Sequence, residues 1–103
     1  MVIISVPKMN DSMSSITIDK KVYVLRFTYN ETGDYWNFGI YDSFQNPIVA
    51  MTKIVPNFPL MHFYTYPELP DVVFCAFSNN DRIGRNDFWD GTATFAYLTS
   101  DEL

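Results

Sequence analysis

Apolar and polar side chains alternate most regularly in residues 22–55, which predicts three antiparallel strands joined by two short loops. The first strand places four large side chains on one face: Tyr23, Leu25, Phe27 and Tyr29. The second strand places three on one face: Trp36, Phe38 and Ile40. Both apolar faces reach the same side of a sheet only if Tyr29 pairs with Trp36, Phe27 with Phe38 and Leu25 with Ile40. This register leaves a loop at residues 31–34, in which Gly33 is available for a positive φ.

The third strand of this meander, predicted at residues 47–55, is apolar on both faces. One face carries Ile48, Ala50, Thr52 and Ile54, and the other carries Val49, Met51, Lys53 and Val55. A strand with one face in water alternates more cleanly than this. We therefore expect another layer, closure of a barrel or a partner chain to cover part of the second face.

Four further runs predict strands at residues 2–6, 14–19, 72–78 and 92–99. Residues 8–12 are expected to form a polar connection, Lys20-Lys21 the turn into the meander, and residues 79–90 a charged loop. No segment shows helical spacing over three turns, so we predict almost no helix. The expected fold is all-β: one domain spanning residues 1–103, built as a small antiparallel β-barrel or β-sandwich of about seven strands.

Residues 56–70 contain four prolines around an aromatic cluster, which excludes a long helix and a central strand. One short strand is predicted near residues 60–64. The aromatic side chains either plug one end of the core or form a contact surface for another protein, since Tyr and Phe are enriched at interfaces. The candidate interface residues are Phe58, Phe63, Tyr64, Tyr66, Phe88 and Trp89.

The chain carries a formal net charge of −5, and its largest basic cluster is the pair Lys20-Lys21. Affinity for nucleic acid depends on local positive charge, so no direct nucleic-acid binding is expected. No run has the length of a transmembrane helix or the form of a secretory signal, so no membrane partner is expected. The single Cys75 lies in an apolar run, which indicates a buried thiol.

Residues for catalysis or metal binding are sparse. His62 is the only histidine, and no serine or cysteine nucleophile motif accompanies it. Residues 79–90 match part of a calcium loop through Asn79, Asp81, Gly84 and Asp90, but Ile83 occupies a ligand position and flanking helices are absent. The sequence therefore predicts a protein that is not an enzyme, with no metal site and no cofactor.

A series of strand and turn motifs runs through the chain in order. It comprises Ile16-Thr17-Ile18-Asp19, Tyr23-x-Leu25-Arg26-x-x-Tyr29-Asn30, Trp36-Asn37-Phe38, Tyr41-Asp42 and Asn46-Pro47-Ile48. Leu60 before an aromatic segment, a buried strand near Val73 and a last strand ending in Tyr97-Leu98 follow. In this order the chain resembles the small phage baseplate plug proteins of contractile tails, over nearly its whole length.

The resemblance implies a structural component of the virion, located at the tail baseplate or hub and assembled in the host cytoplasm. Its implied partners are other baseplate, tail hub or tail tube proteins, and it would help to plug or complete the central tube. A second copy of the chain is a further candidate partner. The negative charge suits a place near a lumen through which DNA passes.

Two other functions are kept open by the residues. One is a β-barrel whose aromatic interior holds a small apolar ligand. The other is an enzyme, which would have to depend on His62.

Overall fold

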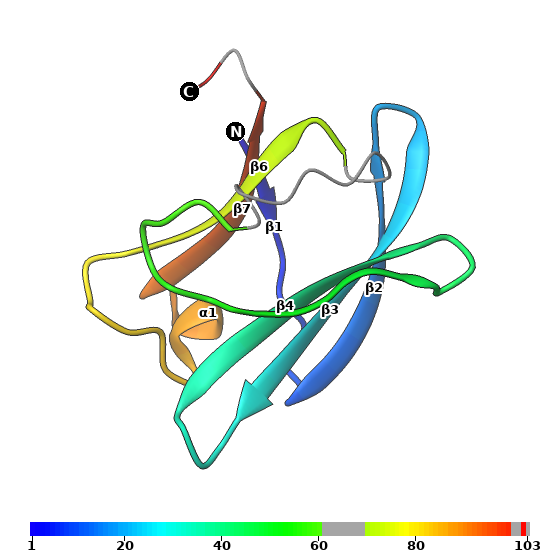
Figure 1. Ribbon diagram of the computed structural model, residues 1–103. Coiled ribbons are helices and arrows are strands. Elements are labelled where there is room, and N and C mark those ends of the chain that lie inside the picture. The colour runs from blue at the N-terminus through cyan, green and yellow to red at the C-terminus, as the bar shows by residue number, and fades with distance from the viewer. Residues whose placement is uncertain (61–69, 100–101, 103) are drawn as a thin grey trace.

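Seven strands form two antiparallel sheets, as the computed structural model shows for residues 1–60, 70–99 and 102 (Figure 1). One sheet has the order β1 (Val2–Ile4), β7 (Ala93–Thr99), β6 (Val72–Ser78). The other has the order β2 (Asp11–Ile18), β3 (Lys21–Asn30), β4 (Tyr35–Asp42), β5 (Pro47–Lys53). The sheets do not close into a barrel, so of the two predicted architectures the structure has the sandwich, and the all-β prediction is confirmed.

The predicted register of β3 and β4 is confirmed. Tyr29 pairs with Trp36, Phe27 with Phe38 and Leu25 with Ile40, as the common apolar face requires. The loop has the expected length, but its positive φ of 56° lies at Asp34 and not at Gly33. Aspartate tolerates this conformation better than most residues with a side chain, because its carboxylate bonds locally.

The hairpin of β2 and β3 turns one residue earlier than predicted. Ile18 pairs with Lys21, so the two turn residues are Asp19 and Lys20, with φ of 52° and 66°. Positive φ at both positions gives the twist that matches two antiparallel strands. Strand β2 also starts at Asp11, within the segment expected to be a connection, because its pairing with β3 continues to Thr28. Strand β1 ends at Ile4, two residues before its predicted end.

The strict alternation predicted for the third meander strand is wrong. Phe38 pairs with Thr52 and Ile40 with Val49, so β5 holds one extra residue between these pairs. This β-bulge changes which side chains of β5 point into the core, so that Val49 is buried and Ala50 is exposed. Strand β5 is an edge strand of its sheet, and its Met51 is 44% exposed.

The core between the sheets is aromatic. Its largest fully buried side chains include Trp36, Phe27, Phe38, Phe74 and Phe95. The ring of Phe95 lies 5.0 Å from that of Phe27 and 5.0 Å from that of Phe38, measured between centroids. Each such pair adds roughly 0.5–1.5 kcal/mol to the stabilisation from burial. These contacts hold the two sheets together.

The free edge of β6 is covered by the segment that follows β5. The side-chain amide of Asn57 bonds both backbone groups of Ser78, donating at 2.6 Å and accepting at 3.2 Å. Leu60 forms an isolated bridge with Phe74, and it is buried. Of the short strand predicted near residues 60–64, only Leu60 lies within the described residues, and there it forms this bridge.

One turn of helix, α1 (Asp87–Asp90), lies inside the segment predicted to be a charged loop. Asn86 precedes the helix, and Gly91 ends it with a φ of 89°. Four residues are too few for helical periodicity to be visible in the sequence.

Gly39→Ala is expected to lower the free energy of unfolding by roughly 2 kcal/mol. A Cβ atom at Gly39 would lie 2.2 Å from the carbonyl oxygen of Ala50 in the bulge, and backbone yields less readily than a side chain. Urea unfolding followed by tryptophan fluorescence measures the change. Gly84→Ala is the matched control, because the nearest atom to its Cβ would lie 3.5 Å away. Equal stability of the two variants would contradict the close contact at the bulge.

Thr52→Val is expected to raise the free energy of unfolding by about 1 kcal/mol. The hydroxyl of Thr52 is buried and has no hydrogen-bond partner in the described structure. Valine has nearly the same shape and no polar group to bury. Thr17→Val, at an exposed position of β2, serves as the control and is expected to change stability by about 0.5 kcal/mol or less. A loss of stability in Thr52→Val, measured by the same unfolding experiment, would mean that the hydroxyl is hydrogen bonded.

Candidate interaction surfaces

The predicted interface residues fall into three groups in the structure. Phe58 follows β5, and its side chain is 52% exposed. Phe63, Tyr64 and Tyr66 lie outside the described residues. Phe88 and Trp89 belong to α1, which lies in the connection that leads from β6 to β7.

Phe88 and Trp89 are half-buried and pack against Trp36. Their ring centroids lie 5.8 Å and 5.9 Å from that of Trp36, both in edge-to-face geometry. The indole Nε1–H of Trp89 donates to the carbonyl of Pro7 at 3.2 Å, and the guanidinium of Arg85 lies 5.3 Å from the ring centroid. These two side chains therefore pack against one end of the core and remain partly exposed.

The segment of residues 79–90 is fastened to the rest of the molecule at several points. Ile83 is buried, and the Nε1–H of Trp36 donates to the carbonyl of Gly84 at 3.1 Å. Arg82 forms an ion pair of 2.7 Å with Asp34 in the β3–β4 loop. The phenol of Tyr29 also donates to Asp34, and this hydrogen bond raises the pKa of the Tyr29 hydroxyl. The two loops are thus joined by charge and hydrogen bonding.

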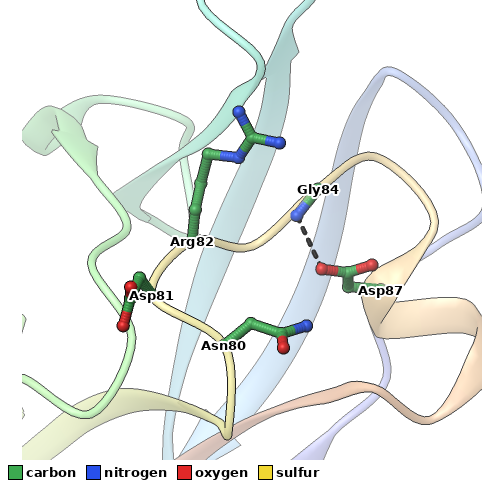
Figure 2. A pocket seen from close by; sticks show the side chains of 5 residues that line it. All are labelled: Asn80, Asp81, Arg82, Gly84 and Asp87. Atoms are coloured by element: carbon green, nitrogen blue, oxygen red, sulfur yellow. Dashed lines mark hydrogen bonds between the residues drawn. The ribbon is translucent and has the colours of Figure 1, made fainter.

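A shallow depression beside this segment is lined by two of the four residues that suggested a partial calcium loop, Asp81 and Gly84, but not by Asn79 or Asp90. Its lining residues are Asn80, Asp81, Arg82, Gly84 and Asp87 (Figure 2). The carboxylate of Asp87 accepts from the backbone N–H of Gly84 at 2.7 Å, whereas Asp81 points away from it (Figure 2). In residues 1–60, 70–99 and 102, no three acidic, histidine or cysteine side chains are grouped as a metal site requires. Asp87 acts here as a local cap for the loop.

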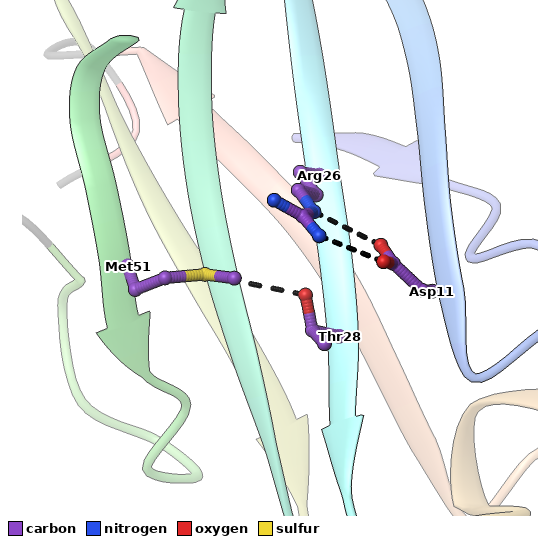
Figure 3. Close-up of polar contacts among 4 residues, drawn as sticks. All are labelled: Asp11, Arg26, Thr28 and Met51. Carbon is purple, nitrogen blue, oxygen red and sulfur yellow. Dashed lines mark hydrogen bonds and ion pairs between the residues drawn. The ribbon is translucent and has the colours of Figure 1, made fainter.

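The outer face of the β2–β5 sheet is open and mixed in character. Arg26 on β3 forms a two-pronged ion pair with Asp11 on β2, with N–O distances of 2.9 Å and 2.7 Å (Figure 3). Thr28 Oγ1 lies 4.0 Å from Met51 Sδ on β5, a weak contact (Figure 3). Three apolar side chains of the same face are exposed: Met13, Val22 and Met51. A face of this kind offers contact area to another protein. Its residues named here do not form a group of side chains typical of a catalytic site.

Cys75 and His62 are two further residues with side chains capable of chemistry. Cys75 is buried, and its burial raises the pKa of the thiol, which disfavours the reactive thiolate. His62 lies outside the described residues. The helix in the described part of the chain is one turn long, too short to span a bilayer.

Sequence reasoning missed the exposed side chains that do not belong to the aromatic cluster. Phe44, in the β4–β5 turn, is 84% exposed, the largest value among the exposed apolar side chains of the described residues. The available signal was an aromatic residue between turn-forming residues, where no core can receive it. Met51 was missed because part of that face of its strand was expected to be covered, and Met13 was missed because it lay just before the strand predicted at residues 14–19.

Comparison with known protein families gives one match. The model of a family described as "Cyanophage baseplate Pam3 plug gp18" matches residues 1–101 of the chain. A search of the curated proteins finds no match. The family match spans both sheets and every strand described above.

Arg26→Met is expected to raise the pKa of the Asp11 carboxyl toward its ordinary value, because the hydrogen bonds from Arg26 hold that pKa down. A carboxyl pKa lowered by folding stabilises the native state above the unfolded-state pKa, and this stabilisation is lost as the pH falls through the folded-state pKa. Since Asp11 is 52% exposed, the loss of stability at neutral pH is expected to be about 0.5 kcal/mol or less. NMR titration of the carboxyl carbons measures the shift.

Asp42 provides an internal control in the same titration. Its pKa is held down by hydrogen bonds from Asn46 and Phe44 in its own turn, so it is expected to stay low in Arg26→Met. An Asp11 pKa unchanged by the substitution would show that the ion pair is absent in solution.

Proposed function

The chain belongs to the cyanophage baseplate plug family, and from this membership we propose that it binds tail tube or hub subunits and helps to close the central tube of a contractile tail. Its family places it among components of the virion tail baseplate. We further propose that it joins the baseplate during assembly in the host cytoplasm. The observation that carries the proposal is the family match over residues 1–101.

The surfaces of the molecule support an assembly role. The proposed contact residues are those of the aromatic group predicted from the sequence: Phe58, Phe63, Tyr64, Tyr66, Phe88 and Trp89. Phe58 is exposed, and Phe88 and Trp89 remain partly exposed while packing on Trp36. Partly exposed aromatic rings on a rigid base suit protein interfaces, because they add contact area at little cost in side-chain entropy.

The open face of the β2–β5 sheet offers a second area for a neighbouring subunit. Met13, Val22 and Met51 supply apolar contact around the Arg26–Asp11 ion pair. Charged pairs in such a face fix the register of a partner more than they add affinity. A protein with neighbours on two sides fits a plug that joins several subunits.

The acidic balance of the chain supports a place at a DNA-conducting tube. The net charge is −5, so the surface as a whole repels a phosphate backbone. A plug that repels DNA blocks the lumen without retaining the genome at its exit.

A ligand-binding barrel has less support than assembly. The two sheets do not close into a barrel. The space between them is filled by aromatic side chains, among them Phe27, Phe38 and Phe95. A small apolar ligand needs an enclosed apolar cavity, and these side chains occupy the space where it would lie.

Cryo-electron microscopy of virions from the phage that encodes this chain is expected to show its two-sheet density in the tail baseplate at the end of the tube. Mass spectrometry of purified tails provides the independent measurement. Tails that contain the tube and hub proteins but lack this chain would contradict the proposed function.

Phe58→Ala is expected to lower incorporation of the chain into tails by roughly tenfold, while the melting temperature changes by less than about 2 °C. The exposed ring of Phe58 contributes little to the core but can contribute to a contact. Met9→Ala, which truncates an exposed side chain elsewhere, is the control and is expected to incorporate normally. Normal incorporation of Phe58→Ala would remove this residue from the proposed interface.

A further inference from the structure

The turn between β4 and β5 presents an aromatic side chain to solvent. Phe44 is 84% exposed, whereas the strands beside the turn bury their large inward-facing side chains. The turn extends beyond the end of the sheet, where it is the green loop at the right of the molecule (Figure 1). An exposed phenylalanine contributes little to folding through burial, and single exposed apolar side chains are common on protein surfaces, so a role for Phe44 depends on how its turn holds the ring.

The turn that carries Phe44 is held in one conformation by Asp42. One carboxylate oxygen of Asp42 accepts from the backbone N–H groups of Phe44 and Asn46, each at 2.9 Å. The other accepts from the side-chain amide of Asn46 at 3.3 Å. Backbone bonds between Asp42 and Asn46 at 3.0 Å, and from Gln45 to Asp42 at 2.9 Å, close the same turn.

The base of the turn is equally constrained. Asp42 pairs with Tyr23 on β3, and Tyr41 pairs with Pro47, so both ends of the turn belong to the sheet. The ring of Pro47 restricts its own φ. The hydrogen bonds lower the pKa of Asp42, so its carboxylate stays ionised and keeps its partners at neutral pH. Phe44 is therefore displayed on a pre-formed support.

A pre-formed support is the feature that separates an anchor from a residue that is merely exposed. Ordering a flexible loop on binding costs conformational entropy, and this cost reduces affinity. Here the backbone around Phe44 is already ordered, so insertion of the ring into a pocket would cost little beyond its own rotamers. Aromatic anchors of this kind dominate the binding energy of many protein interfaces.

The charges at this end of the molecule favour a protein partner. The β2–β3 turn lies at the same end of the sheet, and its Asp19, Lys20 and Lys21 together with Asp42 sum to zero. The whole chain carries −5, so this end is less acidic than the rest. A neighbouring protein with an acidic surface would meet less like-charge repulsion here than at the rest of this acidic chain.

We propose that Phe44 is an anchor residue, and that its ring inserts into an apolar pocket of a neighbouring baseplate protein. This proposal rests on the proposed function and adds to it one contact point and its chemistry. The surrounding turn residues Ser43, Gln45 and Asn46 form the polar rim of the contact, and Asp42 is a positioning residue that holds the ring in place.

The test supplies variants of the chain to a phage that lacks its gene, and measures the copies per purified tail by quantitative mass spectrometry, relative to the tail tube protein. Phe44→Ser is expected to reduce the copy number roughly tenfold or more, and Phe44→Leu to restore much of it. Asp42→Ala keeps the ring but frees the turn, and is expected to give an intermediate loss. Thr32→Ala, at an exposed position of the β3–β4 loop, is the control and is expected to incorporate normally.

Melting temperatures of the purified variants separate assembly from folding. Phe44→Ser is expected to melt within about 2 °C of the unaltered chain, because the ring makes little contact with the core. Phe44→Ser present at normal copy number would overturn the anchor while leaving the proposed function intact. The unaltered chain missing from tails would instead overturn the proposed function itself.

Two further outcomes also count against this contact. If the purified chain forms dimers by sedimentation and Phe44→Ser does not, the occupied pocket belongs to a second copy. If the unaltered chain binds phospholipid vesicles and Phe44→Ser does not, the ring serves a lipid surface. The anchor is supported if the chain is a monomer, does not bind vesicles, and is present at a lower copy number per tail when Phe44 is replaced.

Discussion

Contact between the aromatic inner faces of the two sheets is the interaction on which the rest of this structure depends. Each sheet has one apolar face, and such a face must be buried against another layer. Phe95 of one sheet lies against both Phe27 and Phe38 of the other, and Phe38 also packs on Phe74. These rings fill the interior, which leaves the polar and exposed residues free to act at the surface.

Several acidic side chains of the chain stabilise turns and loops. Asp42 organises the β4–β5 turn, Asp87 caps the loop at Gly84, and Asp34 joins that loop to the β3–β4 hairpin through Arg82. A carboxylate bonded to backbone N–H groups has a lowered pKa and is a poor general acid at neutral pH, as the pKa of Asp42 illustrates. The rigid loops that result are well suited to present side chains to neighbouring subunits. This distribution agrees with a structural member of the baseplate plug family.

The sequence predicted only some of the exposed residues that are candidates for contacts with other proteins. The aromatic candidates were found by residue type, and Phe58 is exposed as an interface residue must be. Phe88 and Trp89 combine a core contact with partial exposure, and the sequence holds no sign of this, because Trp36 lies about fifty residues away in the chain. Phe44 was passed over because a turn predicts polarity and says nothing of how firmly its residues are held.

The sequence alone determined the all-β class and the register of β3 and β4, because alternation with a period of two is a local property of a strand with one buried face. It also determined the position of β6, because a short continuous apolar run is typical of a buried strand. The tertiary structure decided where that rule breaks. The bulge in β5 arises where Ala50 approaches Gly39, the edge of β6 is closed by Asn57, and α1 is held in place by Trp36. Each of these depends on a partner distant in sequence, and no local pattern specifies which distant residues will meet.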